Sequence, residues 1–277
     1  MHAVAVALLA FVGLFLSFTA VWISQLRSRN AGMIDPVWAV TLGGMAVFVA
    51  GLGTGPALNR ALVATGGGIW GLRLARHLWR RNRRQPEDRR YRQFRVQWGD
   101  AAPRNMFWLF QLQALISMLL SVAFFVPAYS PAAPSRSAAV AAVSIWLVAV
   151  AGEAAADRQL KHFLAAPGRR DRVCRVGWWR YSRHPNYFFE CLHWCAYAAL
   201  AIGMPWGWLT LMPPFLMAWL LLRVSGLPLL EAHLVRTRPG YREYMLTTSA
   251  LVPWPPRPAA PPPVARPDHP EDRSTRS

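Results

Sequence analysis

The chain of 277 residues is 54% hydrophobic and only 16% charged, and its formal net charge is +18. Apolar runs of about 20 residues are typical of transmembrane helices. Membrane proteins concentrate basic side chains in cytoplasmic loops that face anionic lipid, so we interpret the positive charge as membrane topology and exclude a nucleic-acid partner.

The apolar runs predict an all-α membrane protein with about seven transmembrane helices. The first run has no early basic region, and no small-residue cleavage site follows it, so it is interpreted as a retained helix and not as a signal peptide. The expected spans are, in chain order, 3–26, 33–51, 57–79, 105–126, 137–156, 186–203 and 208–222.

The loops between these expected spans alternate in charge. The first, third and fifth loops hold several basic residues each, whereas the second, fourth and sixth hold at most one. Basic loops remain on the cytoplasmic side of a membrane, so the alternation predicts an N-terminus outside and a C-terminus in the cytoplasm.

The two parts of the chain differ in composition. Residues 1–252 are expected to form a single multi-span membrane domain. Residues 253–277 are rich in Pro and polar side chains. Such a segment cannot bury enough apolar area to offset the cost of ordering, so it is predicted to be disordered.

Glu153 and Asp157 are candidate functional residues at the cytoplasmic end of the fifth span. They are four residues apart and therefore lie on one face of a helix, where two carboxylates repel each other and oppose the helix dipole. Such an unfavourable arrangement indicates function. The alternative is a structural salt bridge with Arg73, Arg158 or Lys161.

Three more polar residues lie at span ends. Asp35 precedes Pro36, which is typical of a helix start. Arg223 and Glu231 follow the seventh span, and Pro228 is expected to break or kink the helix between them. These positions all fall on the cytoplasmic face, which favours a shared cavity there.

Segment 177–190 reads Gly-Trp-Trp-Arg-Tyr-Ser-Arg-His-Pro-Asn-Tyr-Phe-Phe-Glu. Aromatic and Arg side chains are also typical of an interfacial belt. A belt needs neither an amide nor a carboxylate, so the series favours a site for an anionic ligand at the membrane surface. Its polar side chains are Tyr181, Ser182, Arg183, His184, Asn186, Tyr187 and Glu190.

Cys191 and Cys195 lie one helical turn apart and flank His193. A zinc site requires further ligands, and no second pair with zinc spacing exists in the sequence. Small apolar packing is therefore favoured for both thiols, and no metal site is expected.

The series from Trp179 to Tyr187, followed by Glu190, resembles the signature of bacterial membrane proteins grouped with the C-terminal domain of steroid 5-alpha-reductases, a family once described as a domain of unknown function. The resemblance covers most of the chain, and several ordered motifs together are more specific than any one alone. The other matching positions are Arg29, Asn30, Asp35, Trp38, Trp70, Arg73, Arg90, Tyr91, Trp98, Gly99, Glu153, Asp157, Gln159, Leu160, Phe163, Ser225, Gly226, Glu231, Pro239, Tyr241, Tyr244 and Pro253.

The resemblance implies a reductase of the bacterial inner membrane that uses NADPH, without flavin, to reduce the carbon–carbon double bond of a lipophilic, steroid- or lipid-like enone. The cofactor is implied to lie in a cytoplasm-facing cavity of the C-terminal helices, here about residues 137–252. We add Arg183, His184 and Tyr187 on chemical grounds, because cations bind phosphates and an aromatic ring stacks on nicotinamide or adenine. The expected cofactor-binding residues are Glu153, Asp157, Arg183, His184, Asn186, Tyr187, Glu190, Arg223 and Glu231.

The chain departs from the family pattern at Phe189, where Gly is usual. The catalytic acid is unassigned, with Asp35 and Tyr91 as candidates. An alternative is an S-adenosylmethionine-dependent methyltransferase that resembles the isoprenylcysteine or phospholipid enzymes, which share an Arg-His-Pro-x-Tyr element and a later Glu. Asn186 after the Pro favours the reductase. A third alternative is a non-catalytic membrane protein of the same fold.

Overall fold

A computed structural model describes residues 2–83, 86–169, 171–224 and 226–258. Within these ranges the chain is helical, and its one β-bridge joins Ser182 to Ser249. The α-helices are α1 (Ala3–Ser28), α2 (Ile34–Leu52), α3 (Ala57–Asn82), α4 (Arg89–Trp98), α5 (Ala102–Leu120), α6 (Val122–Tyr129), α7 (Arg136–Ala165), α8 (Pro185–Leu200), α9 (Met212–Trp219), α10 (Leu227–Thr237) and α11 (Tyr241–Thr247).

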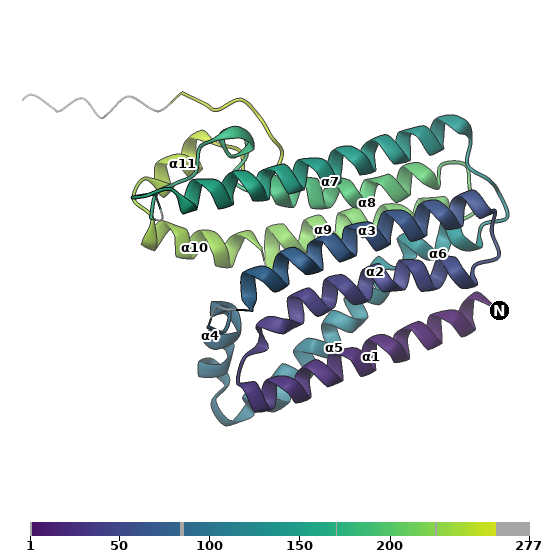
Figure 1. Cartoon of the computed structure of the whole chain (residues 1–277), viewed down its shortest axis with the longest axis horizontal. Helices are drawn as coiled ribbons and strands as arrows, with labels where there is room; N and C mark the ends of the chain where they lie inside the picture. Colours follow the sequence, from purple (N-terminus) through teal and green to yellow (C-terminus); the bar gives the residue numbers. More distant parts are fainter. Residues whose placement is uncertain (1, 84–85, 170, 225, 259–277) are drawn as a thin grey trace, which may run out of the picture.

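The long helices run side by side as one bundle (Figure 1). Within the described residues, five helical segments are long and apolar enough to cross a membrane. They confirm an all-helical membrane protein, whereas the count of seven spans stays a prediction. The five segments are Ala3–Ser28, Ala31–Leu52, Arg89–Tyr129, Arg136–Ala165 and Gly207–Thr237.

Glycine residues allow α2 and α3 to pack closely. A Cβ atom added to Gly43 would lie 2.9 Å from the Cα of Gly71, and one added to Gly67 would lie 2.3 Å from the Cβ of Ala46. Small residues at such a crossing let two backbones approach, which favours association of helices in lipid. This contact fixes the position of α3, whose second half carries Trp70 and Arg73.

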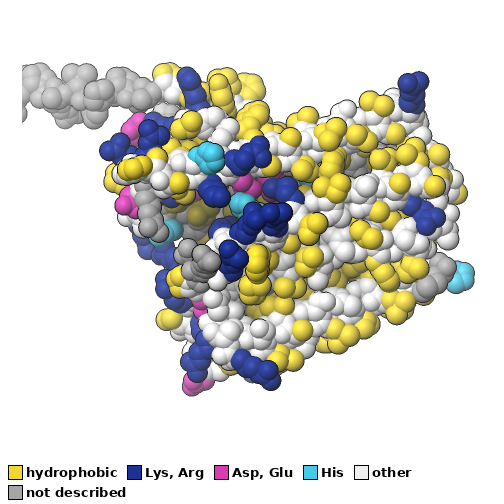
Figure 2. All heavy atoms as spheres, in the orientation of Figure 1, with side chains coloured by type: hydrophobic (Ala, Val, Ile, Leu, Met, Phe, Trp, Pro, Cys, Tyr) yellow, Lys and Arg dark blue, Asp and Glu magenta, His cyan; other side chains and the backbone are white. Residues whose placement is uncertain are grey.

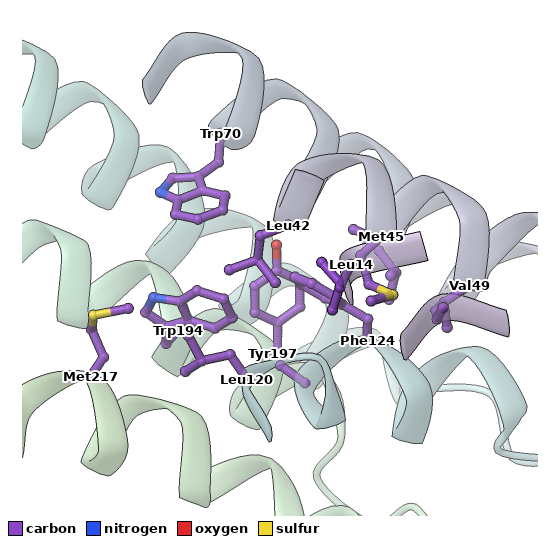
Figure 3. Packing of buried hydrophobic residues seen from close by; sticks show 14 of the residues in the cluster. Leu14, Leu42, Met45, Val49, Trp70, Leu120, Phe124, Trp194, Tyr197 and Met217 are labelled. Atoms are coloured by element: carbon purple, nitrogen blue, oxygen red, sulfur yellow. The ribbon is translucent and has the colours of Figure 1, made fainter. Parts of the chain in front are cut away.

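Large aromatic side chains fill the centre of the bundle. Trp70 of α3 and Trp194 of α8 are completely buried, and their rings meet edge to face at 5.4 Å. Phe124 and Tyr197 continue the cluster towards α6, as Figure 3 shows. The bundle therefore contains a rigid aromatic core directly beside the expected site.

One end of the bundle is charged. In Figure 2, Arg, acidic and His side chains gather at the end that carries α4, α10 and α11, whereas hydrophobic side chains dominate the flanks. The polar stretch between α3 and α5 contributes a separate helix to this end, α4, which lies outside the row of long helices (Figure 1).

A strap of residues 248–258, here called the C-terminal strap, runs beside the start of α8. The Arg183 backbone N–H donates to the carbonyl of Ser249 at 2.8 Å, and the Ser182 hydroxyl donates to the carbonyl of Leu251 at 2.7 Å. The strap therefore fixes the backbone that leads into α8.

The predicted disordered tail begins inside this strap. The Trp254 backbone N–H donates to the carbonyl of Tyr181 at 2.9 Å, and the Arg257 N–H donates to the carbonyl of Thr247 at 2.8 Å. The first residues of the Pro-rich segment are therefore ordered, because the backbone of neighbouring segments supplies partners that composition does not reveal. The expectation for residues 259–277 lies outside the described residues.

Candidate functional site

Arg73 of α3 is the cation that pairs with the acidic residues of α7. Its guanidinium forms an ion pair with Glu153, and its Nη1 lies 3.5 Å from Oδ2 of Asp157. His77, one turn further along α3, places its Nδ1 3.6 Å from the same oxygen. The salt bridge with Arg73 that was an alternative interpretation is therefore present. Among the described residues Arg73 Nε is buried without a hydrogen-bond partner, so this cluster keeps one donor for a ligand.

Asn186 connects α8 to this acidic cluster. Its Nδ2 lies 3.4 Å from Oδ1 of Asp157, and its Oδ1 accepts from the backbone N–H of Tyr187 at 3.1 Å. Pro185 begins the helix, where a missing N–H has no cost. The dipole at this end of α8 favours a negatively charged ligand.

Glu190 lies one turn deeper on α8 and connects it to α3. The indole N–H of Trp70 donates to Oε2 at 2.9 Å, and that of Trp194 donates to Oε1 at 3.0 Å. The side chain is 7% exposed, so the two indoles replace the hydration that the carboxyl group loses. Glu190 was expected to bind cofactor, and the structure shows that each of its oxygens already accepts a hydrogen bond.

Replacing Glu190 with Gln is expected to lower the free energy of unfolding by about 1–3 kcal/mol. The amide presents an N–H₂ donor where the carboxylate presented an acceptor, so one buried indole N–H loses its partner. Chemical denaturation of the purified protein in one detergent measures the change. Glu243→Gln is the control, because Glu243 is exposed and its pair with Arg175 contributes little.

Arg183 and His184 converge on Glu231 of α10. Arg183 Nε lies 2.7 Å from Glu231 Oε1, and Nη2 lies 3.3 Å from Oε2, so the pair is bidentate. His184 Nε2 lies 2.9 Å from the same Oε1. The structure thus brings two adjacent expected cofactor residues into contact with a third, Glu231, which is 47 and 48 positions further along the chain.

The remaining guanidinium nitrogen of Arg183, Nη1, binds backbone carbonyl groups. It donates to the carbonyls of Met245 at 3.0 Å and Thr248 at 2.7 Å. With Glu231 on its other edge, Arg183 holds α10, α11 and the C-terminal strap against the start of α8. The sequence suggested a cation for phosphate, whereas these contacts already use Nε and both terminal nitrogens of the guanidinium.

Tyr241 of α11 completes the group around Glu231. Its hydroxyl donates to Oε1 of Glu231 at 3.4 Å, and the side chain is buried. Burial and the neighbouring Glu231 carboxylate raise the pKa of Tyr241 above its ordinary value. The phenol therefore remains a hydrogen-bond donor across the physiological range.

Tyr187 lies in the first turn of α8 and is partly buried. Its ring stacks on that of His184, with centroids 5.3 Å apart and planes inclined by 15°. The stack places the Tyr187 ring beside His184, which contacts Glu231.

Asp35 and Tyr91, the two candidate catalytic residues, are in contact. The Tyr91 hydroxyl donates to Oδ1 of Asp35 at 3.0 Å, and Arg90 Nη2 donates to Oδ2 at 2.7 Å. Asp35 comes from the first turn of α2, whereas Tyr91 and Arg90 come from α4. Tyr91 is 4% exposed, so its hydroxyl is shielded from water and held by a carboxylate whose charge Arg90 balances.

Arg223 is the expected cofactor residue that joins none of these groups. It lies in the π-helical turn Leu220–Val224, and its side chain is exposed. Pro228 occupies the first turn of α10 and starts that helix, as the expected break required. The adjacent family position Ser225 lies outside the described residues.

Phe189, where the family usually has Gly, places its ring in the contact between α7 and α8. A Cβ atom on Gly152 would lie 2.3 Å from the Phe189 ring, so the ring occupies the space that a larger residue on α7 would fill. The glycine on one helix accommodates the ring on the other.

The cysteines show no metal-binding arrangement. Cys174 is buried, and Cys191 and Cys195 are partly buried free thiols. In the described part of the chain, no three His, Cys, Asp or Glu side chains are grouped so that they could hold a metal ion.

Several residues of the site were missing from the expected set. Arg90 and His77 are polar side chains near helix ends, where a solvated role is the ordinary interpretation. Trp70 carried a signal, because it lies three residues before Arg73 and so on the same helix face. Pairing between distant helices, which makes Trp70 a partner of Glu190, is not encoded in that spacing.

A comparison with known protein families matches much the same part of the chain as the resemblance noted in the sequence. A family model described as a protein of unknown function (DUF1295) matches residues 21–248, which include all the expected site residues. No curated protein and no solved structure matches the chain. Since this family model spans most of the sequence, the protein belongs to the DUF1295 family.

Proposed function

We propose that the protein is an NADPH-dependent membrane reductase that saturates the carbon–carbon double bond of a lipophilic enone. One observation carries the proposal. Expected cofactor residues from α7, α8 and α10 meet around the first turns of α8, where Arg73, Asp157 and Asn186 form one polar group and Arg183 and Glu231 another.

The donors and acceptors at this point fit a nicotinamide dinucleotide. Asp157 and Asn186 present carboxylate and amide groups that suit the hydroxyl and carboxamide groups of such a cofactor. Arg73 Nε is a buried donor without a partner, and the start of α8 favours phosphate. When bound, NADPH supplies the hydride, and the protein supplies orientation, charge and exclusion of water.

Arg183 acts in this proposal by positioning other residues. Its four hydrogen bonds to Glu231, Met245 and Thr248 fix the backbone that presents His184 and Tyr187. The stacked rings of His184 and Tyr187 form an aromatic surface at the edge of the site. Such a surface suits a flat nicotinamide or adenine ring.

Tyr91 is the proposed acid. Reduction of an enone requires a donor near the substrate carbonyl and a proton for the new C–H bond. The Tyr91 hydroxyl is shielded and oriented by Asp35, and Arg90 balances the carboxylate charge. A carbonyl oxygen that reached this hydroxyl would take over its hydrogen bond.

Tyr91→Phe is expected to lower kcat by about 10²- to 10⁴-fold while the affinity for NADPH stays unchanged. The substitution removes the hydroxyl and keeps the ring. NADPH oxidation with a panel of lipophilic enones measures the rate, and a fluorescence titration measures binding. Tyr129→Phe is the matched control, because that hydroxyl donates to the Leu52 carbonyl at the other end of the bundle. Equal rates for Tyr91→Phe and wild type would remove Tyr91 from the mechanism.

We also propose seven spans, with α3 and α8 as inner helices of the bundle, the N-terminus outside and the site facing the cytoplasm of a bacterium. The gathering of Arg side chains at the end with α4, α10 and α11 supports this orientation in the inner membrane (Figure 2). The lipid-facing helices would give a lipophilic substrate access from the bilayer.

A fluorescence titration of the purified protein with NADPH tests the proposed function. A saturable signal that Asp157→Asn weakens is the expected result. A signal that rises linearly with NADPH, when a control reductase saturates under the same conditions, would contradict it.

A further inference from the structure

Phe189 and Gly152 form a ring-on-glycine contact within the interface between α7 and α8. Phe189 is 2% exposed, and a Cβ atom on Gly152 would lie 2.3 to 2.5 Å from three atoms of its ring. Atoms do not approach that closely, so the ring fits only because residue 152 has no side chain. The ring thickness therefore determines how near the two backbones come at this level.

The contact lies directly beside the acidic residues of the site. Glu153 follows Gly152 on α7, and Glu190 follows Phe189 on α8. Glu153 pairs with Arg73. A change in spacing at the ring would therefore shift both carboxyl groups relative to the cation on α3.

The Phe189 ring is also held on its other side. The indole of Trp178 meets it edge to face, with centroids 5.1 Å apart. The Trp178 backbone N–H donates to Oε1 of Gln159 at 2.9 Å, which ties the backbone of residue 178 to α7. The Phe189 ring thus lies between a glycine and an indole.

We propose that Phe189 is a positioning residue for the cofactor site, because its ring, seated on Gly152, sets the spacing of α7 and α8. This proposal rests on the proposed function for its cofactor measurement.

A double-mutant cycle tests the contact. The variants are Gly152→Ala, Phe189→Ala and the double variant, with Gly44→Ala as the control because a Cβ atom there meets nothing within 4 Å. Gly152→Ala is expected to lower the Tm and to weaken NADPH binding on the order of tenfold or more, since misplacement by about 1 Å is costly at such a site. The added methyl group and the ring compete for one space, so the double variant is expected to bind NADPH better than Gly152→Ala alone.

Two outcomes would overturn the proposal. One is a double variant whose losses in Tm and NADPH affinity equal the sum of the two single losses. The other is a Gly152→Ala variant that binds NADPH as well as Gly44→Ala does. If the wild-type protein binds no NADPH, the reductase proposal fails, while the Tm cycle still decides whether the ring and the glycine set the spacing.

Discussion

Arg183→Ala is expected to lower the free energy of unfolding by about 3–5 kcal/mol, the largest loss of any single substitution at the site. The change leaves Glu231 partly buried beside His184 without its bidentate cation. It also removes the side-chain donors to the Met245 and Thr248 carbonyls, so the C-terminal strap keeps only its other contacts with residues 181–183, such as the bond from the residue 183 backbone N–H to Ser249. Chemical denaturation in a fixed detergent measures the loss.

Two further variants make this result specific. Arg175→Ala removes an exposed Arg whose partner Glu243 is also exposed, and it is expected to cost about 0–1 kcal/mol. Glu231→Ala in the Arg183→Ala background is expected to cost much less than it does in the wild type, because the buried charge has already lost its main partner. Equal losses for Arg183→Ala and Arg175→Ala would show that the Arg183 contacts do not hold the strap.

Asp157→Ala is expected to remove the stabilisation that NADPH gives the protein. At a hundredfold excess over Kd a ligand contributes about 2.7 kcal/mol, and a hundredfold loss of affinity reduces this to about 0.4 kcal/mol at the same concentration. The physical reason is that Asp157 orients Asn186 and shares Arg73 and His77. The shift in Tm with and without NADPH measures the effect.

Asp171→Ala is the control for Asp157→Ala, because Asp171 is an exposed carboxylate in the loop before α8. It is expected to keep the full NADPH-dependent shift. If Asp157→Ala also kept the full shift, the acidic pair of α7 would be a structural salt bridge with Arg73 and not part of a cofactor site.

Sequence periodicity predicted where the helices lie along the chain, but not which helices pack against one another. The apolar runs located the long helices, and four-residue spacing placed Glu153 and Asp157 on one face. Residue spacing along α3 says nothing of which helix lies opposite, so the hydrogen bond from Trp70 to Glu190 could not be predicted. The same holds for the contact between Arg183 and Glu231, which are 48 positions apart.

Two features of the charged end escaped prediction for other physical reasons. The stretch before α5 is rich in Arg, so composition indicated a loop, whereas the structure shows α4 packing Tyr91, Phe94 and Trp98 against the core. The same helix carries Arg90 and Tyr91 to Asp35. The C-terminal strap is rich in Pro, yet the backbone groups of residues 181 and 247 give it partners. In both cases tertiary contacts supplied what the local sequence lacked.

Thermal stabilisation by NADPH, compared with stabilisation by S-adenosylmethionine, is the most direct test of the central claim. The purified wild-type protein in one detergent is titrated with each compound, and the Tm is followed to saturation. Our account predicts a saturable rise in Tm with NADPH, its loss in Asp157→Ala, and no rise with S-adenosylmethionine. A rise with S-adenosylmethionine and none with NADPH would contradict the reductase and indicate a membrane methyltransferase.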